Sequence, residues 1–202
     1  QPGMVFVDVG AHVGYYTMLA ARHVGASGKI YAFEPAPSNY DLLVKNVALN
    51  GYENVVTVRS AVSDKTGSST LYLTALDNGR HSIYQHDLPK SGTQQVDTTT
   101  IDTFIEAQGW PKIDVIKVDV EGAEMNVLDG MARLLETQTR LRLVIELNPP
   151  LLAGAGVDPL ELIQRTVNRG FTAGYIDDKN GVVPLELEDV PILVNRLSRE
   201  RS

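Results

Sequence analysis

The chain has 202 residues, of which 43% are hydrophobic and 21% are charged. This size and composition predict one globular domain with a core of its own. The absence of cysteine excludes disulfides, a thiol nucleophile and thiolate metal sites. The net charge of −7 disfavours nucleic acid as a partner, because phosphate binding needs clustered lysine and arginine.

Short β-branched runs alternate with helical periodicity through the first sixty residues. We expect strands at residues 4–9, 29–34 and 55–60, and helices at residues 14–24 and 37–50. Gly51 follows the second helix as its stop signal. Strands that alternate with helices predict a mainly parallel sheet with helices on both faces.

The region after the third expected strand interrupts this alternation. Residues 66–100 carry apolar side chains at alternate positions, as at Leu71 and Leu73, around a polar centre that contains glycine. This pattern predicts an antiparallel β-hairpin, or flap, inserted into a single domain that spans residues 1–202.

The second half of the chain returns to the alternating pattern. We expect strands at residues 113–118, 141–147, 171–176 and 190–197, and a helix at residues 123–135. A further helix begins after Asp158, which is a suitable N-cap because Pro159 follows it at the first helical position.

A glycine-containing turn joins the first strand to the first helix, in Asp8-Val9-Gly10-Ala11-His12-Val13-Gly14. Glycines there let a ligand approach the backbone, and the helix that follows presents free N–H groups. The interval from Gly10 to Gly14 does not fit the dinucleotide pattern G-x-G-x-x-G, and Asp8 would repel a pyrophosphate. The acidic residue favours a cationic ligand such as S-adenosylmethionine over NAD, and a plain structural turn is the alternative.

Polar residues also end the next two strands. Glu34 can accept hydrogen bonds from both hydroxyls of an adenosine ribose, as a carboxylate does in NAD sites. The segment Ser60-Ala61-Val62-Ser63-Asp64 can supply a backbone N–H and a polar side chain to an adenine edge, although it also suits an ordinary turn. An open α/β sheet binds its ligands at the carboxyl ends of its strands, where these residues stand.

Three acidic residues crowd the end of the fourth strand: Asp119, Glu121 and Glu124. Like charges placed together cost free energy unless a cationic cofactor, a metal or catalytic use offsets that cost. Acidic residues at a helix N-terminus are also common and stabilising, which accounts for Glu121 and Glu124 better than for Asp119.

Three motifs of this chain resemble the FkbM family of methyltransferases: VDVGAHVGYYT at residues 7–17, FEP at residues 33–35 and IKVDVEGAE at residues 116–124. The resemblance covers residues 4–148, with the motifs in the family's order. It implies an α/β, Rossmann-like class I methyltransferase fold with a seven-stranded, mostly parallel sheet of order 3-2-1-4-5-7-6. It also implies S-adenosylmethionine as cofactor and O-methylation of a hydroxyl on a sugar, polyketide or related metabolite.

The resemblance assigns roles along the cofactor. It places the glycine turn at the methionine end, Glu34 at the ribose and Asp119 beside the transferring methyl group. His12 departs from the family pattern, because many class I methyltransferases have glycine there. The cofactor-binding residues that we predict are Asp8, Gly10, His12, Gly14, Tyr15, Glu34, Ala61, Val62, Ser63 and Asp119.

An aliphatic hydroxyl is a poor nucleophile, so we expect a general base or a metal to assist methyl transfer. His81 is the first candidate base, since the flap that carries it is a natural substrate lid, and Glu121 is the second. Glu146, at the end of the fifth strand, is a third catalytic candidate through direct contact with the substrate. With Asp119 and Asn148, Glu146 also offers three oxygen ligands for Mg²⁺.

The expected partner is a small-molecule or carbohydrate substrate, without nucleic acid. The chain shows no apolar run of membrane-spanning length, no signal peptide and no cysteine, which favours a cytoplasmic protein without a membrane span. Two alternatives stay open. One is a non-catalytic domain that binds S-adenosylmethionine, and the other is a nicotinamide-dependent oxidoreductase, which the glycine spacing and Asp8 disfavour.

Overall fold

The computed structural model describes residues 1–75, 79–87 and 89–200. Its main sheet has five parallel strands in the order β3-β2-β1-β7-β8. These strands are β1 (Val5–Val9), β2 (Lys29–Phe33), β3 (Val55–Val58), β7 (Val115–Val118) and β8 (Arg142–Ile145). The order agrees with that predicted for the first five strands, but the prediction of seven strands in this sheet is wrong.

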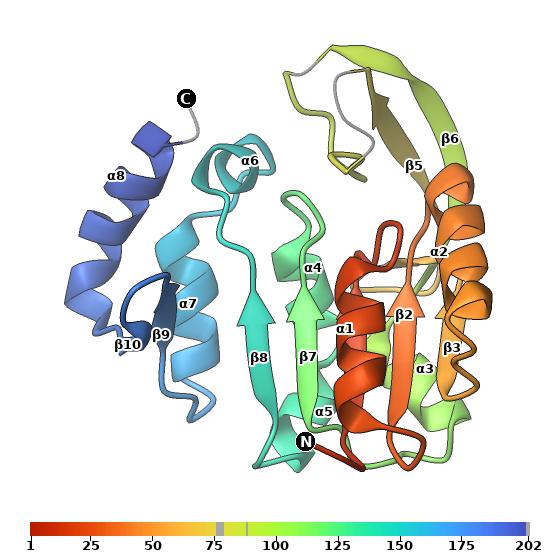
Figure 1. The fold of residues 1–202 in the computed structure, drawn as a ribbon. Helices are drawn as coiled ribbons and strands as arrows, with labels where there is room; N and C mark the ends of the chain where they lie inside the picture. Colours follow the sequence, from red (N-terminus) through yellow and green to blue (C-terminus); the bar gives the residue numbers. More distant parts are fainter. Residues whose placement is uncertain (76–78, 88, 201–202) are drawn as a thin grey trace.

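Helices cover both faces of the main sheet (Figure 1). In that view α1 (Tyr15–Val24) and α2 (Pro37–Leu49) lie in front, and α3 (Ile101–Ala107), α4 (Glu124–Asp129) and α5 (Ala132–Thr137) lie behind. The chain continues after β8 with α6 (Pro149–Gly154), α7 (Pro159–Val167), the 3₁₀ helix η1 (Leu187–Asp189) and α8 (Val190–Glu200). Within the described residues, no helix is both long and apolar enough to cross a bilayer.

Alternate residues of the central strands pack into different layers. Tyr31 and Phe33 of β2 belong to the main core, together with Ile105 of α3. Ala32, which lies between them in sequence, packs instead with Leu43 of α2. This period of two is the side-chain period of a β-strand, and it is why both faces of β2 need helices to cover them.

The predicted hairpin is present and forms part of a second sheet, whose order is β4-β6-β5. The strands are β4 (Ala61–Val62), β5 (Gly67–Thr74) and β6 (Lys90–Thr99). β5 and β6 pair antiparallel, and Figure 1 shows them extending beyond the carboxyl ends of the main strands. Residues 76–78 and 88 of the predicted hairpin lie outside the described residues.

Three predictions for the later part of the chain are wrong. Residues 190–197 belong to α8 rather than to a strand, because Val190 and Leu193 are buried while Ile192 is 70% exposed, which is helical spacing. The strand expected at residues 171–176 begins later, as β9 (Gly174–Asp177), and among the described residues it pairs with β10 (Gly181–Pro184) in a separate antiparallel sheet rather than with the main sheet. The helix expected at residues 123–135 is divided into α4 and α5.

Candidate functional site

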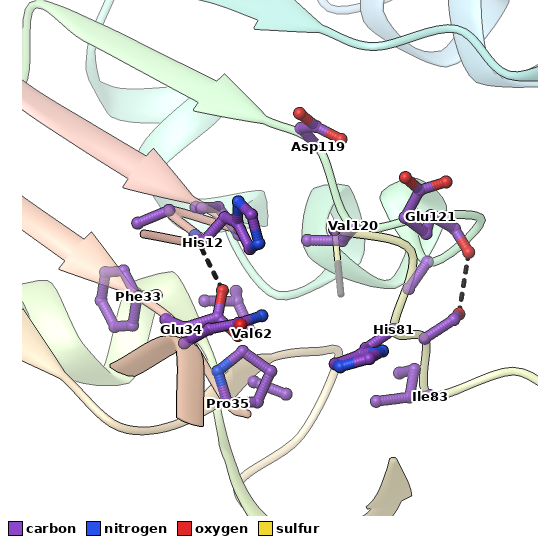
Figure 2. Close-up of a pocket in the computed structure, with 18 of the residues that line it drawn as sticks. His12, Phe33, Glu34, Pro35, Val62, His81, Ile83, Asp119, Val120 and Glu121 are labelled. Carbon is purple, nitrogen blue, oxygen red and sulfur yellow. Dashed lines mark hydrogen bonds between the residues drawn. The ribbon is translucent and has the colours of Figure 1, made fainter. Parts of the chain in front are cut away.

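A cavity of about 250 Å³ lies at the carboxyl ends of β1, β2 and β7, with the hairpin forming part of its wall. Ten predicted site residues line it: Gly10, His12, Tyr15, Glu34, Ala61, Val62, His81, Asp119, Glu121 and Glu146. Three others, Asp8, Gly14 and Ser63, are not among the lining residues. Figure 2 shows His12 and Glu34 on one side of the cavity, with Glu121 and the hairpin residue His81 on the other.

The turn after β1 uses backbone conformations that favour glycine. Gly10 and Gly14 have φ angles of 78° and 93°. A Cβ atom on Gly10 would lie 1.8 Å from the carbonyl oxygen of Asp119, so glycine lets the ends of β1 and β7 approach each other. His12 has a φ of 52°, which is uncommon for a residue with a side chain and typical of functional sites.

Asp8 lies beneath this turn rather than in the cavity wall. Its side chain is fully buried and accepts a 2.7 Å hydrogen bond from the Thr17 hydroxyl of α1. The Nζ atom of Lys117 lies 3.4 Å from the other carboxylate oxygen of Asp8. Burial raises the pKa of Asp8, while Lys117 and Thr17 oppose that rise. Asp8 was expected to face a cationic ligand. Its partner is instead the ammonium group of Lys117, inside the protein.

Lys117 is a cavity residue to which sequence reasoning gave no role. Its Nζ atom donates to the carbonyl oxygen of Gly10 at 3.1 Å and lies 3.2 Å from Oδ2 of Asp119. Burial alone would lower the pKa of Lys117, but the Asp8 and Asp119 carboxylates outweigh it and the pKa is raised. The signal in the sequence that could have identified Lys117 is its position as a charged residue inside the apolar strand β7.

Glu34 closes the turn from the end of β2. Its side chain is buried, and its two carboxylate oxygens accept backbone N–H bonds from His12 at 2.8 Å and Ala36 at 3.0 Å. Burial raises the pKa of Glu34, and these hydrogen bonds partly offset the rise. Each carboxylate oxygen has a second lone pair, so Glu34 can also accept hydrogen bonds from a ligand hydroxyl.

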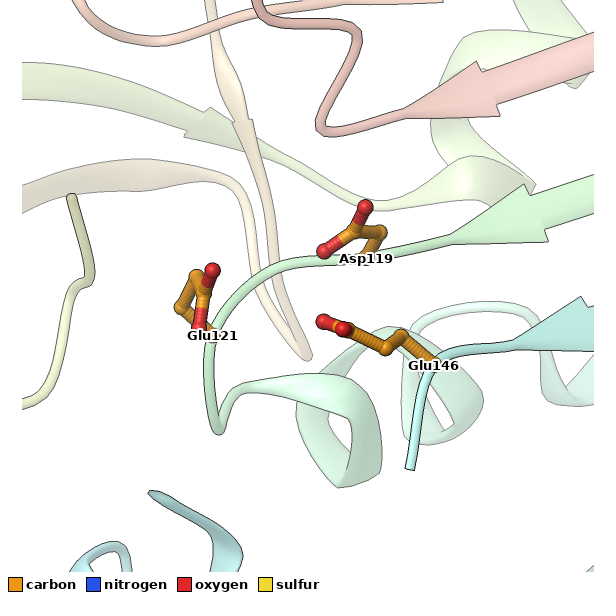
Figure 3. A group of neighbouring side chains, drawn as sticks. All are labelled: Asp119, Glu121 and Glu146. Carbon is orange, nitrogen blue, oxygen red and sulfur yellow. The ribbon is translucent and has the colours of Figure 1, made fainter. Parts of the chain in front are cut away.

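Three carboxylates meet at the ends of β7 and β8. Figure 3 shows the side chains of Asp119, Glu121 and Glu146 directed toward one another, and one oxygen of each lies within 4.8 Å of the others. Burial and then the charges of Glu146, Asp119 and Glu124 raise the pKa of Glu121 to about 8. Such a group exchanges a proton near neutral pH, as a general base must.

The same three carboxylates supply oxygen ligands of the kind that Mg²⁺ binds. The ligand set differs from the one predicted from the sequence. Glu121 takes part in it, whereas Asn148 occupies the N-cap position of α6 and does not line the cavity.

His81 enters the cavity wall from the hairpin with one ring nitrogen engaged. Its Nδ1 atom accepts the backbone N–H of Thr74 at 3.2 Å. The Nδ1 lone pair is therefore already used and does not serve the base role predicted for His81.

Comparison with known proteins identifies the family of this chain. The family described as the methyltransferase FkbM domain matches residues 8–173. The hexuronic acid methyltransferase AglP of Haloferax volcanii is 28% identical over 159 residues, which are 78% of this chain and 59% of that protein. Methyltransferase sdnD of Sordaria araneosa is 31% identical over 156 residues, which are 62% of this chain and 59% of that protein. This chain thus spans less than two thirds of either relative.

The fold is also that of a solved methyltransferase. The crystal structure of methyltransferase FkbM from Methylobacillus flagellatus has a TM-score of 0.55 and 17% sequence identity, over 83% of this chain and 36% of that chain. At this identity the likeness concerns the fold alone, which is the class I methyltransferase fold that implies S-adenosylmethionine as methyl donor. Because the family match includes the glycine turn, Glu34 and the acidic loop after β7, this chain belongs to the FkbM family of methyltransferases.

Proposed function

We propose that this chain transfers a methyl group from S-adenosylmethionine to a hydroxyl oxygen of a small molecule such as a sugar or a polyketide. The observation that carries the proposal is Glu121, a partly buried carboxyl group with a pKa of about 8 in the wall of the cavity. Transfer to an aliphatic hydroxyl needs such a group, because the hydroxyl is a poor nucleophile while it keeps its proton.

The cavity offers partners for each part of the cofactor. Glu34 keeps acceptor capacity for a ribose hydroxyl beside its hydrogen bonds to His12, Ala36 and the Asn39 side chain, and Val62 provides an apolar surface for adenine. Asp119, held near Gly10 by Lys117, supplies negative charge for the cationic end of the cofactor. Bound S-adenosylmethionine supplies an activated methyl group on a sulfonium, so the protein contributes mainly positioning and proton removal.

We assign the proton transfer to Glu121 rather than to His81. As the carboxylate, Glu121 accepts the hydroxyl proton, and the neighbouring charge of Glu146 favours that protonation. We give His81 no part in proton transfer, because its Nδ1 lone pair already accepts the backbone N–H of Thr74. Glu146 thus acts by raising the pKa of Glu121 through its negative charge. It also lines the cavity where the acceptor would bind.

The name of one relative supports the acceptor class. AglP is a hexuronic acid methyltransferase, and it matches 78% of this chain. A sugar or sugar acid is therefore the first acceptor class to test, with a polyketide alcohol as the second.

A divalent cation is the second candidate for activating the hydroxyl. Bound by Asp119, Glu121 and Glu146, it would keep Glu121 ionised and lower the pKa of a coordinated hydroxyl directly. Turnover measured with Mg²⁺ and with a chelator separates the two routes, because only the cation route is lost with the chelator.

The first experiment is calorimetric titration with S-adenosylhomocysteine, with NAD in parallel. We expect binding of S-adenosylhomocysteine alone; if it does not bind, the cofactor assignment fails. Binding of the cofactor product without turnover of any acceptor would instead indicate a non-catalytic domain.

The second experiment measures turnover with methyl-labelled S-adenosylmethionine against uronic acids, neutral sugars and polyketide alcohols. Glu121→Gln should lower kcat by on the order of a hundredfold or more while S-adenosylhomocysteine affinity stays the same. Glu136→Gln, at an exposed glutamate outside the cavity, is the matched control. A Glu121→Gln variant with wild-type kcat would reject Glu121 as the base.

A further inference from the structure

Two residues of the hairpin converge on one backbone atom of the acidic loop. The Ser82 hydroxyl donates to the carbonyl oxygen of Glu121 at 2.8 Å, the bond drawn at Glu121 in Figure 2. The Nε2 atom of His86 lies 2.8 Å from the same oxygen. A carbonyl oxygen only accepts, so His86 carries its proton on Nε2 and donates a hydrogen bond to the Glu121 carbonyl oxygen.

The backbone of Glu121 needs such support. Its φ angle is 54°, in the left-handed region that a residue with a side chain seldom adopts. A conformation of this kind is strained and persists only where surrounding contacts impose it. On the other side of the loop, Oε1 of Glu124 accepts the N–H groups of Val120 and Gly122 at 3.3 and 3.2 Å. Ser82, His86 and Glu124 together therefore hold this loop.

The imidazole of His86 packs between two glycines. A Cβ atom on Gly122 would lie 3.0 Å from its Cε1 atom, and one on Gly154 would lie 2.9 Å from its Nδ1 atom. Gly154 is the last residue of α6, so the ring fits between the acidic loop and that helix. The position of His86 is thus set by packing as well as by its hydrogen bond.

We propose that Ser82 and His86 are positioning residues, which hold Glu121 in its left-handed conformation so that its side chain points at the acceptor hydroxyl. This inference rests on the proposed function, in which Glu121 is the base. If both donors are lost, residue 121 relaxes to an ordinary conformation and its carboxylate leaves Asp119 and Glu146. The hairpin then contributes to catalysis through the backbone of another loop rather than through His81.

The variants Ser82→Ala and His86→Phe each remove one donor, and their combination removes both. The combination should lower kcat by about tenfold or more with little change in KM or in S-adenosylhomocysteine affinity. His86→Gln, which keeps an N–H donor at a similar reach, should restore most of the kcat lost in His86→Phe. In a Glu121→Gln background the two substitutions should have no further effect on kcat, because they act through Glu121.

Tyr84→Phe is the matched control. The Tyr84 hydroxyl donates to Oδ1 of Asn126 at 2.8 Å, so this variant loosens the hairpin without touching the Glu121 carbonyl. It should keep wild-type kcat. An equal loss in Tyr84→Phe, or an equal loss in the Glu121→Gln background, would overturn the proposal.

A second readout does not depend on turnover. The pKa of the Glu121 carboxyl, measured by carbon-13 NMR in the cofactor-free protein, reports where the side chain lies. Its charged neighbours are Asp119, Glu124, Glu146 and Arg80. In Ser82→Ala/His86→Phe the pKa should fall toward 4.5, the value of an unperturbed glutamate. An unchanged pKa would overturn the positioning role, whereas a wild-type protein with no turnover would reject only the proposed function.

Discussion

Lys117 and Asp8 form a buried ion pair beneath the glycine turn, with Nζ 3.4 Å from Oδ1 of a fully buried carboxylate. The same ammonium group also contacts Asp119 at 3.2 Å, so one cation joins the ends of β1 and β7. Two carboxylates that would otherwise repel each other are thereby held on either side of the cofactor turn.

We expect Lys117→Met to destabilise the fold by about 3–5 kcal/mol, because it leaves the Asp8 charge buried without its partner. Urea unfolding of wild type and variant measures the change in the free energy of unfolding. Asp8→Asn/Lys117→Met, which removes both charges, should recover most of that loss. If the double variant instead loses as much as the sum of the single ones, the two residues are not coupled.

Glu34→Gln should raise the dissociation constant of S-adenosylhomocysteine by about tenfold or more. The amide keeps one acceptor oxygen but places an NH₂ group against the N–H of His12 or Ala36, so the turn and the ribose contact are both impaired. Calorimetric titration measures the affinity. Glu53→Gln, at an exposed glutamate away from the cavity, should bind S-adenosylhomocysteine like wild type. If Glu34→Gln also binds it like wild type, the assignment of Glu34 fails.

The stability of the cofactor-free protein should fall as the pH rises from 4.5 toward about 8, the unperturbed and folded-state pKa values of Glu121. In that interval the folded protein keeps a proton that the unfolded chain has released, and the effect levels off above it. For this partly exposed group the effect is on the order of a few kcal/mol at most. Urea unfolding at several pH values should show a weaker dependence in Glu121→Gln, and an identical dependence would contradict the raised pKa.

Gly130→Ala tests a contact between α4 and the end of β4. A Cβ atom at Gly130 would lie 2.0 Å from the carbonyl oxygen of Ser63, although its φ of −75° is ordinary for any residue. We expect a loss of about 3 kcal/mol in the free energy of unfolding. Gly51 has a φ of 67°, and a Cβ atom there would have no heavy atom within 4 Å. Gly51→Ala should therefore lower the free energy of unfolding by only about 1 kcal/mol. Equal losses in thermal or urea unfolding would argue against the steric contact.

The edge of the sheet that forms the cavity could be predicted because its signals are local. A β-branched run followed by glycine or an acid identifies a strand and its end, and Gly10, Glu34 and Asp119 indeed line one cavity. The end of the chain gave weaker signals. The β-branched residues of 190–197 suggested a strand, and helical burial became visible only from the buried Val190 and Leu193, which stand three residues apart with the exposed Ile192 between them.

The sequence by itself determined the alternating α/β architecture, the inserted hairpin and the residues at the strand ends, since periodicity and turn chemistry are read within a few residues. The order of the first five strands came from the resemblance of three motifs to the FkbM family. Only the tertiary structure decided that Asp8 pairs with Lys117, that His81 uses Nδ1 for Thr74, and that Ser82 and His86 meet the Glu121 carbonyl. Most of these partners lie far apart along the chain, and packing alone brings them together.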